Sequence, residues 1–337
     1  MNFKAMFALC TASLLLLAGC SNKPASSQES VQSTASGTTQ STQLQTEDTV
    51  DLVATTYPVY LLASAITEHV EGVQVTRLNT GAVSCLHDYT LSVNDMKQIE
   101  GADIIVMNGA GLEEFMDDAL ERTTGTVVDC SVNVPLLENE GHVHVEGDEN
   151  DHDHGHWDPH YWMNPENMVI AAENIYNKMV ELDADNTQQY QENLLTVTTM
   201  LNSWKSNFED IFQVEEGPEI TGLITFHDGF RYFADAYDLP LLAAIEEEEG
   251  SEASAKEINE ITQLVQEYQI PVIFTEVNGS DATARAIARE TGCQVAQLNM
   301  LMDGPEYSGL DDYYDVMIAN VQAIVNGFAG EEVLVTE

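Results

Sequence analysis

The stretch ITFHDGFRYFADAY, residues 224–237, places a histidine between two apolar patterns of different period. Residues 220–225 form a short apolar run that predicts a buried strand, and residues 229–237 repeat apolar side chains at helical spacing. His227 therefore stands where a strand ends and a helix follows. In an open parallel α/β sheet, ligands bind beyond the carboxyl ends of the strands. The stretch thus predicts the fold class and one candidate binding residue.

The same alternation of strand and helix recurs along the chain. Apolar runs predict strands at residues 50–55, 73–78, 104–107, 126–129, 241–244, 272–275 and 294–297. Helical patterns fall at about 59–70, 93–100, 255–268, 280–291 and 312–327, and Ser92 with Asp95 predicts a capping box before the second of these. Short buried runs of this kind are typical of parallel sheets that helices cover on both faces.

Two long helical patterns interrupt the alternation in the middle of the chain, at residues 165–182 and about 187–212. We therefore predict an α/β fold of two lobes with parallel sheets, joined by linking helices. The expected boundaries are an N-terminal lobe at 49–165, linking helices at 166–213 and a C-terminal lobe at 214–330. No sequence repeat relates the two halves.

The N-terminus predicts export. Residues 1–20 carry Lys4, a short apolar run and small residues, a pattern typical of a secretory signal and too short to span a bilayer comfortably. This segment ends in LAGC, which resembles a bacterial lipobox and implies lipidation of Cys20; plain cleavage is the alternative. Residues 21–48 are rich in Ser, Thr and Gln and predict a flexible tether. We expect an extracytoplasmic protein that is lipid-anchored to the cell membrane.

The formal net charge of −46 over 337 residues argues against nucleic acid as a partner, because phosphates require a basic surface. The same charge keeps the protein soluble and concentrates cations around it, and we expect a monomer. Three cysteines, Cys85, Cys130 and Cys293, remain beyond the signal and cannot all pair internally. Cys85 lies two residues before His87, so it could supply a thiolate ligand, although packing is the plainer interpretation.

The nine histidines are distributed in a distinctive way. His87, His160 and His227 each stand alone beside a predicted strand end or helix start. Five others form a histidine-rich tract at residues 142–156: His142, His144, His152, His154 and His156. Neutral imidazole is the commonest metal ligand in proteins. Because two facing lobes would bring the three single histidines together, we predict that they form a metal site.

Five segments, in order along the chain, resemble the zinc- and manganese-binding solute-binding lipoproteins of bacterial metal ABC importers. The first two are LHDYTLSVNDMKQIEGADIIVMNGAGLEEFM at 86–116 and DPHYWMNP at 158–165. The others are TFHDGFRYFADAYDL at 225–239, SEASAKEINEITQLVQEYQIPVIFTE at 251–276 and LDDYYDVMIANVQAI at 310–324. The resemblance covers residues 50–327. It implies two α/β lobes joined by a long helix, a metal cleft between them, and an ABC permease with its ATPase subunit as partners.

The resemblance also implies the roles of individual residues. His87 and His160 would be ligands from the first lobe and His227 a ligand from the second. Manganese binders of the family generally carry a glutamate where His227 stands, and three imidazoles favour Zn²⁺ over the harder manganese ion. The histidine-rich tract is likewise typical of the zinc members, and we interpret it as a low-affinity collector or sensor of zinc; a solvated loop without a role is the alternative.

The sequence departs from the family at the fourth ligand. The family usually supplies an aspartate before the final helix, where this chain reads LNMLMDGPEYSGLDD, residues 298–312. Asp303 is the nearest carboxylate, Asn299 stands near the usual position in some members, and water could complete the shell instead.

Other functions are less well supported by the residues. A zinc hydrolase could use Asp158, Asp228 or Glu276 as a base, but no HExxH or HxxEH segment is present, and we predict that the chain is not an enzyme. Binding of manganese or another divalent metal is an alternative to zinc. Surface adhesion is a further alternative, since lipoproteins of this family have been described as adhesins, and no residue indicates a specific adhesive partner.

Overall fold

The structure is a computed structural model that describes residues 49–78, 89–139, 156–215, 217–246, 254–277 and 279–333. The predicted signal with Cys20, the tether, Cys85 and His87 lie outside these residues, as do His142, His144, His152 and His154 of the histidine-rich tract. Within the described residues, no helix has the length and apolar character needed to cross a membrane.

The first lobe is built on a four-stranded parallel sheet with the strand order β2-β1-β3-β4. Its strands are β1 (Val50–Ala54), β2 (Val73–Arg77), β3 (Ile104–Met107) and β4 (Thr126–Asp129). Its helices are α1 (Tyr57–Ile66), α2 (Val93–Gly101) and α3 (Asp117–Leu120). The capping box is confirmed: Ser92 accepts the Asp95 amide, and the Asp95 carboxylate accepts the Ser92 amide.

The second lobe repeats this topology with the strand order β6-β5-β7-β8, again parallel. Its strands are β5 (Leu223–His227), β6 (Leu241–Glu246), β7 (Val272–Glu276) and β8 (Gln294–Leu298), and its helices are α6 (Arg231–Ala236), α7 (Ala255–Glu267) and α8 (Ala282–Thr291). The two halves therefore share an architecture that no repeat in their sequences discloses. The predicted two-lobed α/β fold with parallel sheets is confirmed.

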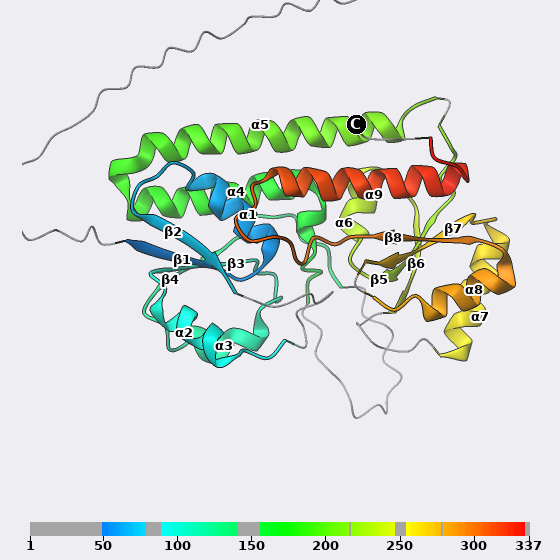
Figure 1. The fold of residues 1–337 in the computed structure, drawn as a ribbon, viewed down its shortest axis with the longest axis horizontal. Helices are drawn as coiled ribbons and strands as arrows, with labels where there is room; N and C mark the ends of the chain where they lie inside the picture. The colour runs from blue at the N-terminus through cyan, green and yellow to red at the C-terminus, as the bar shows by residue number, and fades with distance from the viewer. Residues whose placement is uncertain are drawn as a thin grey trace, which may run out of the picture. The chain divides into compact units, whose positions relative to one another are not determined.

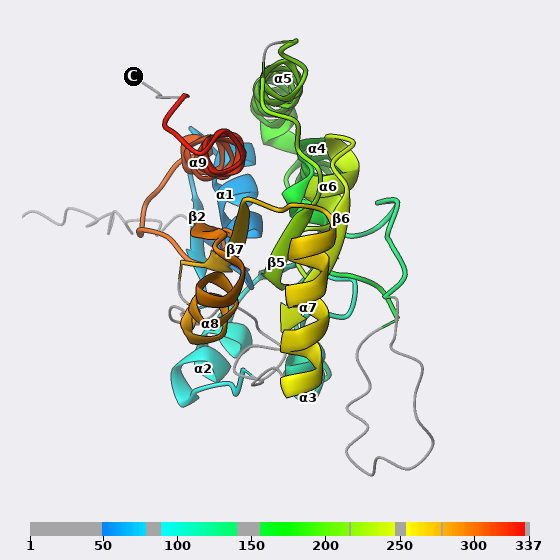
Figure 2. The same ribbon diagram turned by 90° about the vertical axis from the view of Figure 1, so that its right-hand side faces the viewer.

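Three long helices cover one side of both sheets: α4 (Pro165–Leu182), α5 (Thr187–Phe212) and α9 (Asp311–Ala329). In Figure 1 these helices and α1 run along one side of the sheets, whereas α2, α3, α7 and α8 lie on the other; Figure 2 gives the same layers end-on. Helix α5 buries one stripe of side chains, Tyr190, Val197, Leu201 and Phe208. Their spacing keeps them on one helix face.

The strand β5 differs from its prediction. It begins at Leu223 rather than residue 220, because its ladder starts where Leu223 pairs with Leu241 and the Leu223 amide bonds the Pro240 carbonyl. It also extends to His227, so this histidine is the last strand residue rather than the first loop residue. Helix α1 ends at Ile66, before the predicted residue 70, and the short helix α3 had no counterpart among the predicted elements.

The segment between β8 and α9, residues 299–310, fastens the two lobes together. Arg77 at the end of β2 bonds the Asp303 carboxylate at 2.8 Å and the Gly304 carbonyl at 2.6 Å. The Arg77 guanidinium also lies 4.7 Å from the centre of the Tyr57 ring, and the Tyr57 hydroxyl donates to Asp312. Gly304 is required here, since a Cβ would lie 2.2 Å from that ring.

Asn320 on α9 holds the start of the same segment. Its side chain, 1% exposed, donates to the Asn299 carbonyl at 2.7 Å and accepts the Asn299 amide at 2.8 Å. Replacing Asn320→Ala should lower the free energy of unfolding by about 2–4 kcal/mol, because it leaves two backbone groups without partners. Urea unfolding would measure this loss. Gln322→Ala on the same helix is the control and should cost less than about 0.5 kcal/mol; equal losses would show that the Asn320 bonds contribute nothing specific.

Candidate metal site

Two histidines from different lobes meet at the carboxyl end of β5. His227 is the last residue of this strand and is 6% exposed. His160 directly precedes the short 3-10 helix Tyr161–Met163 and is 4% exposed. Their Nε2 atoms are 3.3 Å apart, and the two rings are inclined by 81°. Two nitrogens that each bind one tetrahedral zinc at about 2.0–2.1 Å lie roughly 3.3–3.4 Å apart. The spacing of this pair therefore suits a shared zinc ion.

Asp158 orients the His160 ring. Its Oδ1 atom lies 2.9 Å from the His160 Nδ1 and accepts the His160 amide at the same distance. A carboxylate only accepts hydrogen bonds, so the proton sits on Nδ1 and the lone pair is left on Nε2, facing His227. A ligating histidine in proteins usually has such a carboxylate partner on its other ring nitrogen. Asp158 is itself 1% exposed, and Arg231 lies 4.0 Å from its Oδ2 atom.

A buried network around Glu113 holds the loop on which His160 is carried. The Glu113 carboxylate accepts the Thr55 hydroxyl at 2.6 Å and the amides of Asn108 and Gly109 at 2.7 and 3.0 Å. Asn108 in turn donates its side-chain amide to the Pro159 carbonyl and accepts the Tyr161 hydroxyl on its own carbonyl. Both neighbours of His160 are therefore tied to the loop after β3.

Burial raises the pKa of Glu113 to about 7. The bonds from Thr55, Asn108 and Gly109 oppose this rise, and the charge of Asp129 adds to it. The carboxyl group is thus protonated more readily in the folded protein than in the unfolded chain.

The second lobe closes around the pair through Gly229 and Met300. A Cβ built on Gly229 would lie 2.2 Å from the Met300 sulfur, 3.0 Å from His227 Cδ2 and 3.3 Å from His160 Cδ2. The absent side chain therefore leaves the room in which the two rings and the sulfur approach each other. The Trp162 indole donates to the Met300 carbonyl at 2.8 Å and joins this loop to the His160 segment.

The side chains of the other predicted site residues bond different partners in the structure. Asp303 is paired with Arg77, and the Asn299 side chain accepts the Leu301 amide at 2.8 Å. Among the described residues, no third His, Cys, Asp or Glu joins His160 and His227 in a group that could hold a metal; His87 is outside them. Of the carboxylates that could act as a base in a hydrolase, Asp158 bonds the His160 ring, and Glu276 is the last residue of β7 and is 7% exposed.

Comparison with known proteins identifies the family of this chain. The family described as zinc-uptake complex component A, periplasmic, matches residues 52–327. This chain belongs to that family. Its members are described as periplasmic components of a zinc-uptake complex.

Individual relatives share less than a third of their aligned residues with this chain. The zinc-binding protein AdcA of Streptococcus pyogenes is 28% identical over 320 residues, which cover 88% of this chain and 60% of AdcA. This chain therefore spans about three-fifths of the length of that relative. The manganese-binding lipoprotein MntA of Halalkalibacterium halodurans is 26% identical over 72% of this chain and 77% of its own.

Solved structures support the fold. A crystal structure of ZnuA superposes with a TM-score of 0.69 at 26% identity, covering 83% of this chain and 99% of that one. A mutant structure of the laminin-binding adhesin Lmb of Streptococcus agalactiae gives a TM-score of 0.69 at 24% identity, covering 81% of this chain and 98% of that one. The likeness to the adhesin concerns the fold alone.

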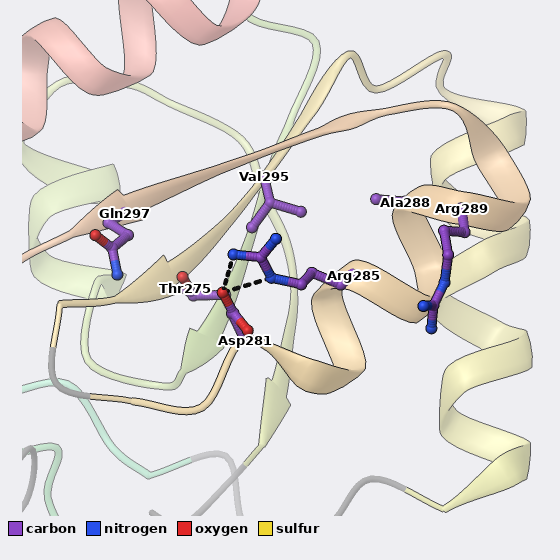
Figure 3. Close-up of a pocket in the computed structure, with 7 residues that line it drawn as sticks. All are labelled: Thr275, Asp281, Arg285, Ala288, Arg289, Val295 and Gln297. Atoms are coloured by element: carbon purple, nitrogen blue, oxygen red, sulfur yellow. Dashed lines mark hydrogen bonds and ion pairs between the residues drawn. The ribbon is translucent and has the colours of Figure 1, made fainter.

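A pocket of about 630 Å³ lies in the second lobe (Figure 3), and neither His160 nor His227 lines it. It is lined by Thr275, Asp281, Arg285, Ala288, Arg289, Val295 and Gln297, from β7, β8, α8 and the segment before α8. Arg285 pairs with Asp281 at 2.6 Å, and Arg289 adds a second positive charge. Two guanidinium groups repel a divalent cation, so this pocket is not a candidate metal site.

The sequence prediction missed the residues that position the two candidate ligands. Glu113, Asn108, Gly229 and Met300 carried no assigned role, although three of them lie inside the quoted segments 86–116 and 225–239. The signal for Glu113 was available as the first of two acidic residues, Glu113 and Glu114, that follow the glycine-containing turn NGAG after a buried strand. Met300 has no local signal, because its relation to the histidines arises only from the folded chain.

The raised pKa of Glu113 predicts how stability depends on pH. The folded protein holds a proton that an unfolded carboxyl group with a pKa of 4.5 loses first, so this stabilisation is complete below pH 4.5 and is lost as the pH rises through about 7. Between pH 5 and 8, the free energy of unfolding of the wild type should fall relative to that of Glu113→Gln by on the order of 3 kcal/mol.

Urea unfolding of the metal-free proteins across this pH range would measure the difference. Glu114→Gln, an exposed neighbour, is the control and should follow the wild type. Parallel curves for the wild type and Glu113→Gln would show that Glu113 titrates normally.

Proposed function

We propose that this chain captures zinc outside the cytoplasm and delivers it to a membrane ABC permease that works with an ATPase subunit. The observation that supports this best is the pair of buried imidazoles, one from each lobe, whose Nε2 atoms are 3.3 Å apart. The Asp158 partner of His160 adds to this support, because it leaves the Nε2 lone pair free for a metal. The description of the family as a zinc-uptake component agrees with this role.

His87 is the third ligand in this proposal. It follows β2, whose carboxyl end lies at the same edge of the first sheet as the ends of the other parallel strands. The fourth donor is Asp303, Asn299 or water. Asp303 would have to give up its bond to Arg77, and Asn299 its bond to the Leu301 amide, so water requires the smallest rearrangement.

Manganese is the runner-up cargo, since one relative is named a manganese-binding lipoprotein. The donors of the described pair argue against it. Both are nitrogen atoms, whereas manganese prefers oxygen donors, and the nearest carboxylate to His160 binds the ring rather than the ion.

Three further features complete the proposal. Cys20 carries a lipid anchor that keeps the protein, as a monomer, at the outer side of the cell membrane. The histidine-rich tract supplies weaker zinc sites through His142, His144, His152, His154 and His156. Of these, His156 packs edge-on against Trp157 with ring centres 4.4 Å apart. We expect these sites to be weak, because ordering a polar, acidic segment around an ion costs chain entropy.

Replacing His87, His160 or His227 singly by Ala should weaken the tight zinc site by more than about 100-fold. Such changes remove a ligand, whereas changes to groups that only orient ligands cost about 10–100-fold. Asp158→Asn should fall within that smaller range. Competition with a chromophoric zinc chelator at pH 7.5 would measure all four affinities.

The matched control is His69→Asn, which removes an exposed histidine and tolerates its positive φ of 61°. It should leave the affinity unchanged. An unchanged affinity in any of the three alanine variants would remove that histidine from the site.

Replacing the five tract histidines by Asn should leave one tight zinc site per chain and remove the weaker ones. Substitution is preferable to deletion, because the His156 carbonyl accepts the Asn139 amide and Trp157 pairs with Glu138. Calorimetric titration of both proteins would count the sites. Loss of the tight site would mean that the tract supplies a primary ligand.

A further inference from the structure

The thioether of Met300 packs close to the histidine pair, and the proposed function gives it no role. The Met300 sulfur and the Cδ2 atoms of His160 and His227 surround one point, at 2.2, 3.3 and 3.0 Å from the position of a Cβ on Gly229. Each Cδ2 atom is bonded to the Nε2 atom that faces the other ring. The sulfur therefore lies no farther than about 5.5 Å from the Cδ2 atom of either ring.

Hydrogen bonds hold the backbone on both sides of Met300. The Met300 carbonyl accepts the Trp162 indole, and Asn299 is held on both its amide and its carbonyl by Asn320. Leu301 adopts a φ of 60° and donates its amide to the Asn299 side chain. Met300 itself is 3% exposed. The Met300 side chain is thus buried on a turn whose backbone is held by hydrogen bonds.

The carboxylate of the same loop is directed elsewhere. Asp303 bonds Arg77 at 2.8 Å, in the first lobe. The candidate donors of this cluster, among the described residues, are therefore two imidazole nitrogens and one sulfur. Imidazole suits several transition metals, and thioether sulfur selects soft ions, of which Cu(I) is the leading example.

We propose that Met300 is a specificity-determining residue, whose thioether binds monovalent copper together with His160 and His227. This inference rests on the proposed function only in taking the histidine pair as a metal site. The same sulfur disfavours manganese, because a hard ion gains nothing from a thioether donor. Zinc binding depends on the imidazoles and is largely independent of the sulfur.

The test compares Cu(I) and zinc binding by the full chain, with the five tract histidines replaced by Asn in every sample. Cu(I) is added alone under anaerobic, reducing conditions and competes with a chromophoric Cu(I) chelator. The parent should bind one Cu(I) per chain. Met300→Leu, which keeps the volume and removes the sulfur, should weaken Cu(I) by at least about tenfold and change zinc affinity by less than about threefold. His227→Ala should lose both metals.

Met302→Leu is the matched control, a second buried methionine of the same loop, and should leave Cu(I) binding unchanged. X-ray absorption at the copper edge should show a sulfur neighbour in the parent and none in Met300→Leu. Equal Cu(I) affinity of parent and Met300→Leu, or equal losses of Cu(I) and zinc, would overturn the assignment, since the sulfur would then only pack. A parent that binds Cu(I) but no zinc would refute the proposed zinc capture and leave the role of Met300 intact.

Discussion

The hydrogen bond between Asp158 and the His160 Nδ1 atom is the interaction on which the site depends. It determines which ring nitrogen carries the proton, and so it leaves a lone pair directed at His227, 3.3 Å away. Two imidazole nitrogens at this distance attract each other only through a shared proton or a shared cation. The buried Asp158 is placed by its own amide bond to the Leu137 carbonyl and by the Tyr232 hydroxyl on its carbonyl. Orientation of one ring thus involves backbone from the first lobe and a helix of the second.

The relative position of the two histidines follows from how firmly the lobes are joined. His160 belongs to a segment whose next residues bond the second lobe, through the Trp162 indole to Met300 and the Trp162 carbonyl to the Tyr313 hydroxyl. The segment 299–310 returns the connection by binding Arg77 and packing Gly304 on the Tyr57 ring. A pair of ligands from two lobes is sensitive to small rotations of the lobes, because a metal–ligand bond weakens when its distance changes by a few tenths of an ångström. Several independent bonds across the interface therefore serve the same end as the Asp158 contact.

The sequence predicted the elements well where a regular pattern carried the information. The ends of α4 and α5 and the strands β3 and β4 agree with the predicted bounds, because helical stripes and short buried runs repeat within a few residues. His160 and His227 were found for a related reason, as single histidines beside element ends. The ion pair of Arg77 with Asp303 joins residues 226 positions apart, and the approach of Met300 to the rings depends on an absent Cβ at Gly229. Neither contact leaves a local pattern in the sequence. The sequence analysis therefore could not foresee that Asp303 is paired with Arg77.

The charge of the chain and the chemistry of the site act at different stages of binding. A formal net charge of −46 raises the concentration of every divalent cation near the surface and does not distinguish zinc from calcium, magnesium or manganese. Selection must then come from the donors, which in our proposals are imidazole nitrogen and thioether sulfur rather than oxygen. Three acidic side chains of the surrounding segments have structural partners: Asp158 bonds a ring, Asp303 bonds Arg77, and Glu113 accepts backbone amides. Because these three carboxylates are already bonded, they are poor ligands for the hard cations that the surface charge gathers, and a site built on imidazole would favour softer ions.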